Sequence, residues 1–181
     1  MNNRGTRTLE TPRLVLRRFT PEDAPAMFAN WASDPEVTKY LTWPTHTSAD
    51  ITAWVVNSWC QNYAQSNYYH WCITLKGKDE AIGDIAVVEQ KEIIFCAEVG
   101  YCLGRKWWHQ GIMSEALQAV MTCLFEDGYQ RVEAGHDVNN PHSGDVMKKC
   151  GMRYEGTHRK AGKNNQGIVD MALYAMLAED R

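Results

Sequence analysis

The sequence has no long hydrophobic run. Its longest apolar stretch, Met171 to Ala178, is much shorter than the roughly 20 residues that a membrane-spanning helix needs. The N-terminal segment MNNRGTRTLE lacks the apolar core of a secretory signal peptide. We therefore expect a cytoplasmic protein that has no membrane among its partners.

The sequence also has no large excess of charge of one sign and no paired cysteine motif. Nineteen Lys and Arg against 22 Asp and Glu give a formal net charge of -3, which offers no attraction to phosphate polymers and argues against nucleic acid as a partner. The six cysteines include no C-x-x-C pair and mostly interrupt apolar segments, which is typical of reduced, buried thiols. We expect no metal site.

The composition is that of an ordinary globular domain. With 181 residues, of which 44% are hydrophobic and 23% charged, the chain is long enough for one domain with its own core. Strands are predicted at 13–19, 68–75, 81–88, 93–103, 131–138, 154–159 and 168–177, and helices at 21–32, 48–63, 113–125 and 140–150, with a helical turn at 34–41 and a polar loop at 160–167. This order predicts one mixed α/β domain over residues 1–181.

Aromatic residues are concentrated in one part of the chain. Nine Trp and Tyr residues lie between Trp31 and Trp71, so this region either packs a dense core or lines a pocket. Ser48 is predicted to cap the helix at 48–63. Helical spacing predicts that the buried stripe of this helix consists of Ile51, Trp54, Val55, Trp59 and Tyr63.

A strand, a loop and a helix follow one another between Val99 and Leu117. The free backbone N–H groups and the positive dipole end of a helix start bind phosphate. Gly111 would let the backbone approach such an anion, and Arg105 and Lys106 add positive charge nearby. Taken alone, the same residues fit equally well an ordinary capped helix beside a solvated basic turn.

Several short motifs occur in an order that is known from one family. They are Leu9 to Arg17, Ile82 to Ile85, Glu98 to Tyr101, Trp107 to Gly111 with Glu115 to Leu117, Asn140 to Ser143, Lys149 to Gly156, and Asp170 before Leu173-Tyr174. Over nearly the whole chain this set resembles the GNAT superfamily of N-acetyltransferases. Within it the likeness is to the RimJ/RimL-like branch, which acetylates the N-termini of ribosomal proteins.

This resemblance implies a fold and a co-substrate. The fold would be a single GNAT-like domain of the α/β (α+β) class, with a mixed, mostly antiparallel sheet whose central strands splay apart and are flanked by helices. Acetyl-CoA would lie with its pantetheine arm along strand 98–103 and its pyrophosphate on residues 108–113. The residues implied in its binding are Val99, Tyr101, Leu103, Trp108, His109, Gln110, Gly111, Ile112, Met113, Asn140 and Ser143. His109 and Met113 replace the small residues that are usual at their positions.

The resemblance also implies direct attack of an amine on the thioester, without a cysteine nucleophile. Glu98 is the candidate general base, and its alternative role is a structural carboxylate paired with a nearby cation. Many GNAT enzymes have a tyrosine seven residues after the motif asparagine, where this chain has Met147. The branch is thought to use the serine three residues after the asparagine, here Ser143, to stabilise the leaving thiolate. The alternative role of Ser143 is that of a helix hydroxyl bonded to backbone N–H groups.

The acceptor would be an amine, either a protein N-terminus or a small molecule. In this fold the aromatic region forms one wall of the acceptor site, where Trp31 and Trp43 are candidates for substrate contact and Trp54 and Trp59 for core packing. A catalytically silent acyl-CoA-binding module is the alternative function, motivated by Met113 and by the missing tyrosine. A nucleotide-binding regulator is disfavoured, because no G-x-x-x-x-G-K-[ST] or G-x-G-x-x-G run occurs. The oligomeric state, monomer or homodimer, stays open.

Overall fold

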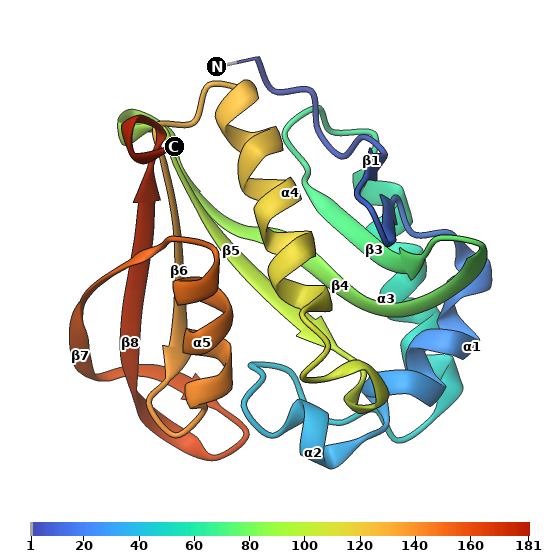
Figure 1. Ribbon diagram of the computed structural model, residues 1–181. Helices are drawn as coiled ribbons and strands as arrows, with labels where there is room; N and C mark the ends of the chain where they lie inside the picture. Colours follow the sequence, from blue (N-terminus) through green and yellow to red (C-terminus); the bar gives the residue numbers. More distant parts are fainter. Residues whose placement is uncertain (1) are drawn as a thin grey trace.

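Eight strands form one mixed sheet in the computed structural model, which describes residues 2–181 (Figure 1). The strands are β1 (Leu9–Glu10), β2 (Leu14–Arg17), β3 (His70–Leu75), β4 (Lys78–Lys91), β5 (Cys96–Leu103), β6 (Arg131–Asp137), β7 (Arg153–Asn164) and β8 (Gly167–Leu177). Their order in the sheet is β1-β2-β3-β4-β5-β6-β8-β7. All neighbours are antiparallel except β5 and β6, which are parallel.

Helices cover both faces of this sheet. They are α1 (Ala24–Met27), α2 (Pro35–Thr38), α3 (Ala49–Asn62), α4 (Ile112–Glu126) and α5 (Pro141–Lys149). The larger core lies between the sheet and α4 and α5, and a smaller core lies between the sheet and α1 to α3. Figure 1 shows α4 and α5 in front of the sheet. The predicted class, a mixed α/β sheet flanked by helices, is therefore confirmed.

The predicted elements differ from the observed ones mainly in the long hairpins. Residues Glu92–Ile94 form a 3-10 turn between β4 and β5 instead of the start of a strand. The polar loop predicted at 160–167 is mostly strand, because β7 continues to Asn164 and only residues 165 and 166 separate it from β8. β7 is an edge strand with mostly exposed side chains. The polar residues that natural edge strands carry make such a strand resemble a loop in sequence.

The buried face of α3 also differs from the predicted stripe. The Ser48 cap is confirmed, since its hydroxyl accepts a hydrogen bond from the backbone N–H of Ile51. Trp54, however, is 73% exposed, and Ile51 is exposed too. The fully buried positions are instead Thr52 and Val56. Of the predicted stripe, Val55, Trp59 and Tyr63 are confirmed as partly buried against the smaller core. The prediction followed apolar side chains at helical spacing, whereas a threonine occupies one of the contacts with the core.

An opening is built into the middle of the sheet. β5 pairs with β6 only from Cys96↔Arg131 to Glu98↔Glu133, although both strands continue beyond these pairs. β4 pairs with β5 as far as Leu103, and β8 pairs with all of β6. Each diverging strand is thus held by its outer neighbour, so the splay between β5 and β6 is a fixed feature of the two half-sheets, visible in Figure 1.

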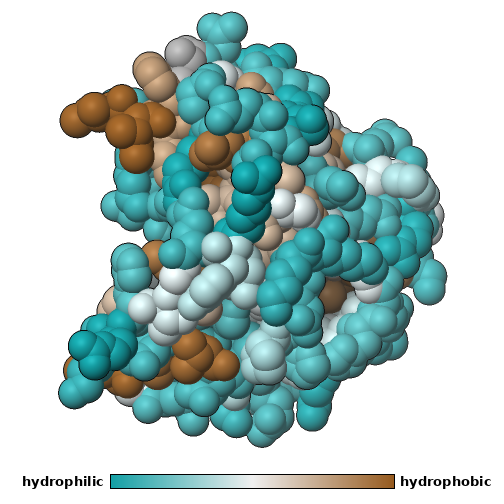
Figure 2. All heavy atoms as spheres, turned by 60° about the vertical axis from the view of Figure 1, so that its left-hand side comes forward, coloured by the Kyte–Doolittle hydropathy of each residue, from teal (hydrophilic) through white to brown (hydrophobic). Residues whose placement is uncertain are grey.

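The surface carries separate apolar groups. The large exposed hydrophobic residues include Ile93 in the turn between β4 and β5, and Tyr154 and Ile168 in the hairpin of β7 and β8. On the face in Figure 2, brown groups are divided by hydrophilic atoms. Within residues 2–181, no helix has the length and hydrophobicity that crossing a membrane requires.

Candidate functional site

A cavity of about 730 Å³ occupies the opening between β5 and β6. Its lining comes from both faces of the sheet. On one face, which we call the α4 side, it includes Trp108, Gly111 and Lys149. On the other, which we call the α3 side, it includes Trp43 and Trp59. Two ligands that enter from opposite faces could therefore meet in the splay.

Two cations converge on Gly111, the residue directly before α4. Gly111 has a left-handed backbone, with φ of 72°, and directly precedes the free N–H groups of the helix. A Cβ atom placed on Gly111 would lie 3.3 Å from Lys149 Nζ and 3.6 Å from Arg13 Nη2. Backbone N–H groups, a helix dipole and two side-chain cations thus surround one point, which is the arrangement that binds a diphosphate.

Glu115 fixes the position of Arg13. Its carboxylate accepts hydrogen bonds from Arg13 Nε at 2.6 Å and from the Thr11 hydroxyl at 2.6 Å. Arg13 Nη1 also donates to the carbonyl of Gln110 at 2.9 Å. Burial alone raises the pKa of Glu115, but the bonds from Thr11 and Arg13 outweigh burial and lower it. The Glu-Ala-Leu motif therefore ties the loop between β1 and β2 to the helix start.

A serine and a tyrosine face each other on the α4 side. The Ser143 hydroxyl, in the first turn of α5, donates to the phenol oxygen of Tyr101 at 3.1 Å, and Tyr101 donates to the Ser143 carbonyl at 2.9 Å. Burial raises the pKa of Tyr101. Ser143 is therefore bonded across the opening to β5, instead of to the backbone N–H groups of its own helix. Met147 is buried and takes no part in the cavity lining.

Glu98 lies at the closed end of the splay. It is half-buried and lines the cavity, with Glu89 and Glu133 as its partners in the neighbouring strands. Burial raises the pKa of Glu98, and the negative charge of Glu133 raises it further. Glu133 is paired with Lys91 and Arg131, which lower its pKa against the effect of burial. Adjacent carboxylates with opposite shifts are typical of acid and base sites.

The α3 side of the cavity is lined by aromatic residues, and hydrogen bonds join its edge to the β7–β8 turn. Trp43 lines the cavity, as predicted for a substrate contact, and so does Trp59, which was assigned to core packing. Trp31 is fully buried in the smaller core and is absent from the lining, so it cannot touch a ligand in the cavity. The side chain of Asn165 donates to the carbonyls of Thr38 and Trp43 at 2.9 and 2.8 Å, which ties the β7–β8 turn to this rim.

The structure brings together most residues implied in co-substrate binding. Those that line the cavity are Val99, Tyr101, Leu103, Trp108, His109, Gly111, Ile112, Met113, Asn140 and Ser143. Gln110 is not among them; its side chain donates to the carbonyl of Lys106. His109 adopts a left-handed backbone, with φ of 58°, where the family usually has glycine. Ile112 and Met113 are buried in the larger core.

Sequence reasoning missed several residues in or near the cavity. Lys149 and Arg13 were quoted only as parts of motifs, and their convergence on Gly111 depends on tertiary contacts. Tyr101 was among the predicted residues, but its hydrogen bond with Ser143 was not predicted. His70 and Asp84, which line the α3 side, had no signal beyond the membership of Asp84 in the Ile82 to Ile85 motif. Residues 2–181 contain no group of three His, Cys, Asp or Glu side chains placed to hold a metal ion.

Comparison with known proteins gives consistent matches. Residues 13–153 match the family model described as the acetyltransferase (GNAT) domain. The "Uncharacterized N-acetyltransferase p20" of Bacillus licheniformis is 30% identical over 176 residues, covering 96% of this chain and 97% of that protein. The "Ribosomal-protein-serine acetyltransferase" of Escherichia coli is 32% identical over 105 residues, covering 58% of this chain and 59% of that protein.

A solved structure has the same fold. It is described as RimL, a ribosomal L7/L12 α-N-protein acetyltransferase in complex with coenzyme A, and is 24% identical with a TM-score of 0.85. The match covers 97% of this chain and all (100%) of the solved chain. The arrangement of strands and helices described above is therefore a known one.

Proposed function

This chain belongs to the GNAT family of acetyltransferases, and from that premise we propose that it transfers the acetyl group of acetyl-CoA directly to an amine. It is an acyltransferase whose co-substrate is acetyl-CoA. The observation that carries the proposed mechanism is the splay between β5 and β6, which leads from the cationic start of α4 to Glu98.

The cavity suits acetyl-CoA in size and in charge. Its volume of about 730 Å³ lies within the range of small-molecule sites. The diphosphate would accept from the N–H groups that follow Gly111, beside Arg13 and Lys149. The pantetheine amides would pair with the edge of β5 beyond Glu98, which β6 leaves free. Asn140, at the start of α5, is a further partner for those amides.

Glu98 is proposed as the group that takes the proton of the acceptor amine, directly or through a water molecule. An amine attacks a thioester only in its neutral form. An α-amine with a pKa of about 7.7 to 8.0 is partly neutral near pH 7, whereas deprotonating a lysine there costs over about 4 kcal/mol. A carboxylate whose pKa is raised by burial is therefore a sufficient base for an N-terminal acceptor.

Ser143 is proposed as the donor to the departing thiolate. Its hydroxyl lies on the α4 side of the cavity, held by Tyr101 from β5. The single proton of this hydroxyl, which now lies on the Tyr101 oxygen, would turn to the sulfur, where a donor that faces developing charge lowers the barrier. Tyr101 is then a positioning residue, since its contact with the reaction runs through Ser143.

A protein N-terminus is the acceptor that we propose first. Two of the similar proteins are named for acetylating ribosomal proteins. The test is to mix the protein with acetyl-CoA, a panel of N-terminal peptides and small amines, and a thiol reagent that reports free coenzyme A. Coenzyme A release with at least one peptide supports the proposal. Binding of acetyl-CoA without release across the panel would support the silent acyl-CoA-binding module instead.

Replacing Ser143 by alanine should lower kcat by roughly tenfold, the effect of losing one donor with partial replacement by water. Acetyl-CoA affinity should stay unchanged, because the diphosphate contacts are untouched. Steady-state kinetics and calorimetry measure the two quantities. Ser58→Ala is the matched control, since this hydroxyl on α3 bonds only to the Val55 carbonyl outside the cavity. Full activity of Ser143→Ala would leave Ser143 a structural role only.

Replacing Glu98 by glutamine should lower kcat/KM for the acceptor by roughly 100-fold near pH 6, the scale of general base catalysis. Only the ionised form of Glu98 accepts a proton. As the pH rises, wild-type activity should therefore increase around the pKa of Glu98, which is higher than that of an ordinary glutamate, and again around the pKa of the amine. The deficit of the variant should shrink as pH rises and the amine becomes neutral. Glu89→Gln removes the neighbouring carboxylate as a control. A wild-type pH profile in Glu98→Gln would exclude this role.

A further inference from the structure

A histidine and an aspartate form a polar pair on the α3 side of the cavity. His70 Nε2 lies 3.0 Å from Asp84 Oδ2, and His70 Nδ1 lies 3.0 Å from the hydroxyl of Tyr68. A neutral imidazole satisfies both contacts, with the phenol donating to Nδ1 and Nε2–H donating to the carboxylate. His70 and Asp84 line the cavity, and Asp84 has one oxygen outside this pair.

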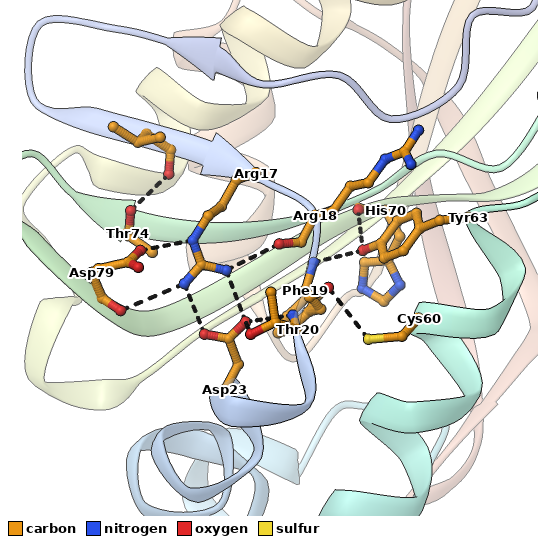
Figure 3. A network of polar contacts seen from close by, with 11 residues as sticks. Arg17, Arg18, Phe19, Thr20, Asp23, Cys60, Tyr63, His70, Thr74 and Asp79 are labelled. Atoms are coloured by element: carbon orange, nitrogen blue, oxygen red, sulfur yellow. Dashed lines mark hydrogen bonds and ion pairs between the residues drawn. The ribbon is translucent and has the colours of Figure 1, made fainter.

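The pair is held rigidly by its surroundings. The ring of Trp59 lies 4.2 Å from that of His70, and Phe19 lies 5.3 Å away on an edge contact. Tyr63 donates to the His70 carbonyl at 2.8 Å and accepts from the Phe19 backbone at 2.9 Å. Figure 3 shows the two hydrogen bonds by which Tyr63 joins Phe19 and His70. Asp84 is thus aimed by a network that a substrate does not need to organise.

Asp84 carries a negative charge that no lysine or arginine neutralises. Within residues 2–181 its only ion-pair partner is His70, and its side chain is 15% exposed. Partial burial of a carboxylate without a cation is unfavourable, so a cationic ligand would gain from the pairing. Trp43 and Trp59 line the same side of the cavity, and such rings attract ammonium and guanidinium groups. The site therefore has the chemistry of a cation subsite.

The distance to Glu98 separates this subsite from the reaction centre. Asp84 pairs with Cys102, which lies four residues along β5 from Glu98. At about 3.3 Å per residue, the two positions are about 13 Å apart along the strand. Between them Ala86 pairs with Gly100, and both line the cavity. The side chain of Val88 lies over Gly100, with Cγ1 3.0 Å from the place of an added Cβ, and it also lines the cavity. A linear aliphatic chain that joins a group at Glu98 to a group at Asp84 would therefore pass along an apolar lining.

We propose that Asp84 binds a second positively charged group of the acceptor, separated by an aliphatic chain from the amine that is acetylated. The proposal rests on the proposed transferase function and deepens it. Two kinds of acceptor would carry two such cationic groups. One is a peptide whose N-terminus is followed by a basic side chain, and the other is a small diamine. His70 is a positioning residue, because it acts through Asp84.

The first experiment uses the wild-type protein saturated with coenzyme A, so that no acetyl transfer occurs. Calorimetry compares the affinity for heptylamine with that for the matching diamine, diaminoheptane. The second compares KM for two peptides that begin with serine and carry either lysine or uncharged norleucine at position two. We expect the doubly charged probe to bind roughly tenfold better in at least one pair, equivalent to about 1.4 kcal/mol. The pair that shows the preference identifies the source of the second charge.

Asp84→Asn tests the assignment to this residue. Its amide oxygen keeps the bond from His70 Nε2–H, while the charge is lost. The tenfold preference should disappear through a higher KM or Kd for the doubly charged probe, with kcat and acetyl-CoA affinity unchanged. Asp79→Asn is the matched control, because it removes a carboxylate from the same strand at a position 83% exposed. The control should keep the preference.

Several results would overturn the proposal. If the wild type binds the singly and doubly charged probes of each pair equally well, the proposal is wrong. Retention of the preference in Asp84→Asn would overturn it as well, and an equal fall in kcat for both peptides would place Asp84 in the chemistry instead of in recognition. Failure of the transferase function has a different signature, namely no release of coenzyme A from acetyl-CoA with any acceptor, whereas the calorimetric preference is measured without turnover.

Discussion

Gly111→Asp is expected to weaken acetyl-CoA binding roughly 100-fold, because it places a carboxylate at the point where the diphosphate is proposed to lie. The new Cβ would stand 3.3 Å from Lys149 Nζ and 3.6 Å from Arg13 Nη2. The introduced carboxylate would pair with both cations and repel the anion. Aspartate is among the residues that tolerate the left-handed backbone of this position, where φ is 72°, so the fold should be retained.

Gly111→Asn is the control for this variant. Asparagine has the same shape and meets the same backbone requirement but adds no charge, so its loss of affinity should stay within about tenfold. Titration calorimetry with acetyl-CoA measures both variants. Equal affinities of Gly111→Asp and the wild type would remove the diphosphate from the start of α4.

Asp127→Ala is expected to lower the free energy of unfolding by about 3 kcal/mol or more, the usual effect of breaking a buried charge network. The Asp127 side chain is fully buried just after α4. It accepts from Arg4 Nε at 2.7 Å, Arg7 Nη1 at 3.0 Å and the Tyr69 hydroxyl at 2.8 Å. Alanine would leave these donors without their acceptor. For a chain of this length, thermal unfolding should shift down by roughly 6 to 12 °C.

Glu126→Ala is the matched control for the stability measurement. Glu126 also pairs with Arg7, at 3.0 Å, but its side chain is 54% exposed. Exposed ion pairs contribute at most about 1 kcal/mol, so this variant should unfold close to the wild-type temperature. Equal shifts for the two variants would contradict the assignment of the stabilising role to the buried carboxylate.

The order of strands and helices could be predicted because most elements have a clear hydrophobic period. Two elements misled that reasoning for physical reasons. Trp54 falls on the helical stripe by spacing, yet it is exposed, and the contact face of α3 contains Thr52. The end of β7 has the composition of a loop because both its backbone edge and its side chains meet solvent. Composition reports exposure, and on an edge strand exposure does not distinguish strand from loop.

The candidate site was predictable only where its residues are neighbours in sequence. The loop before α4 and the strand that precedes it were recognisable as one motif. Lys149 reaches Gly111 from α5 and Arg13 from the loop between β1 and β2, and no local pattern reveals such a meeting. The same holds for the pairing of Ser143 with Tyr101 across the splay and for His70 with Asp84 across two strands. Tertiary contacts select which of many polar residues share a cavity.

A crystal structure of the protein with acetyl-CoA would locate the co-substrate directly. We expect electron density for the pantetheine arm between β5 and β6, the diphosphate at the N–H groups after Gly111, and the thioester between Ser143 and Glu98. Density at another place on the protein, with the opening between the two strands closed by side chains, would contradict the proposed mechanism.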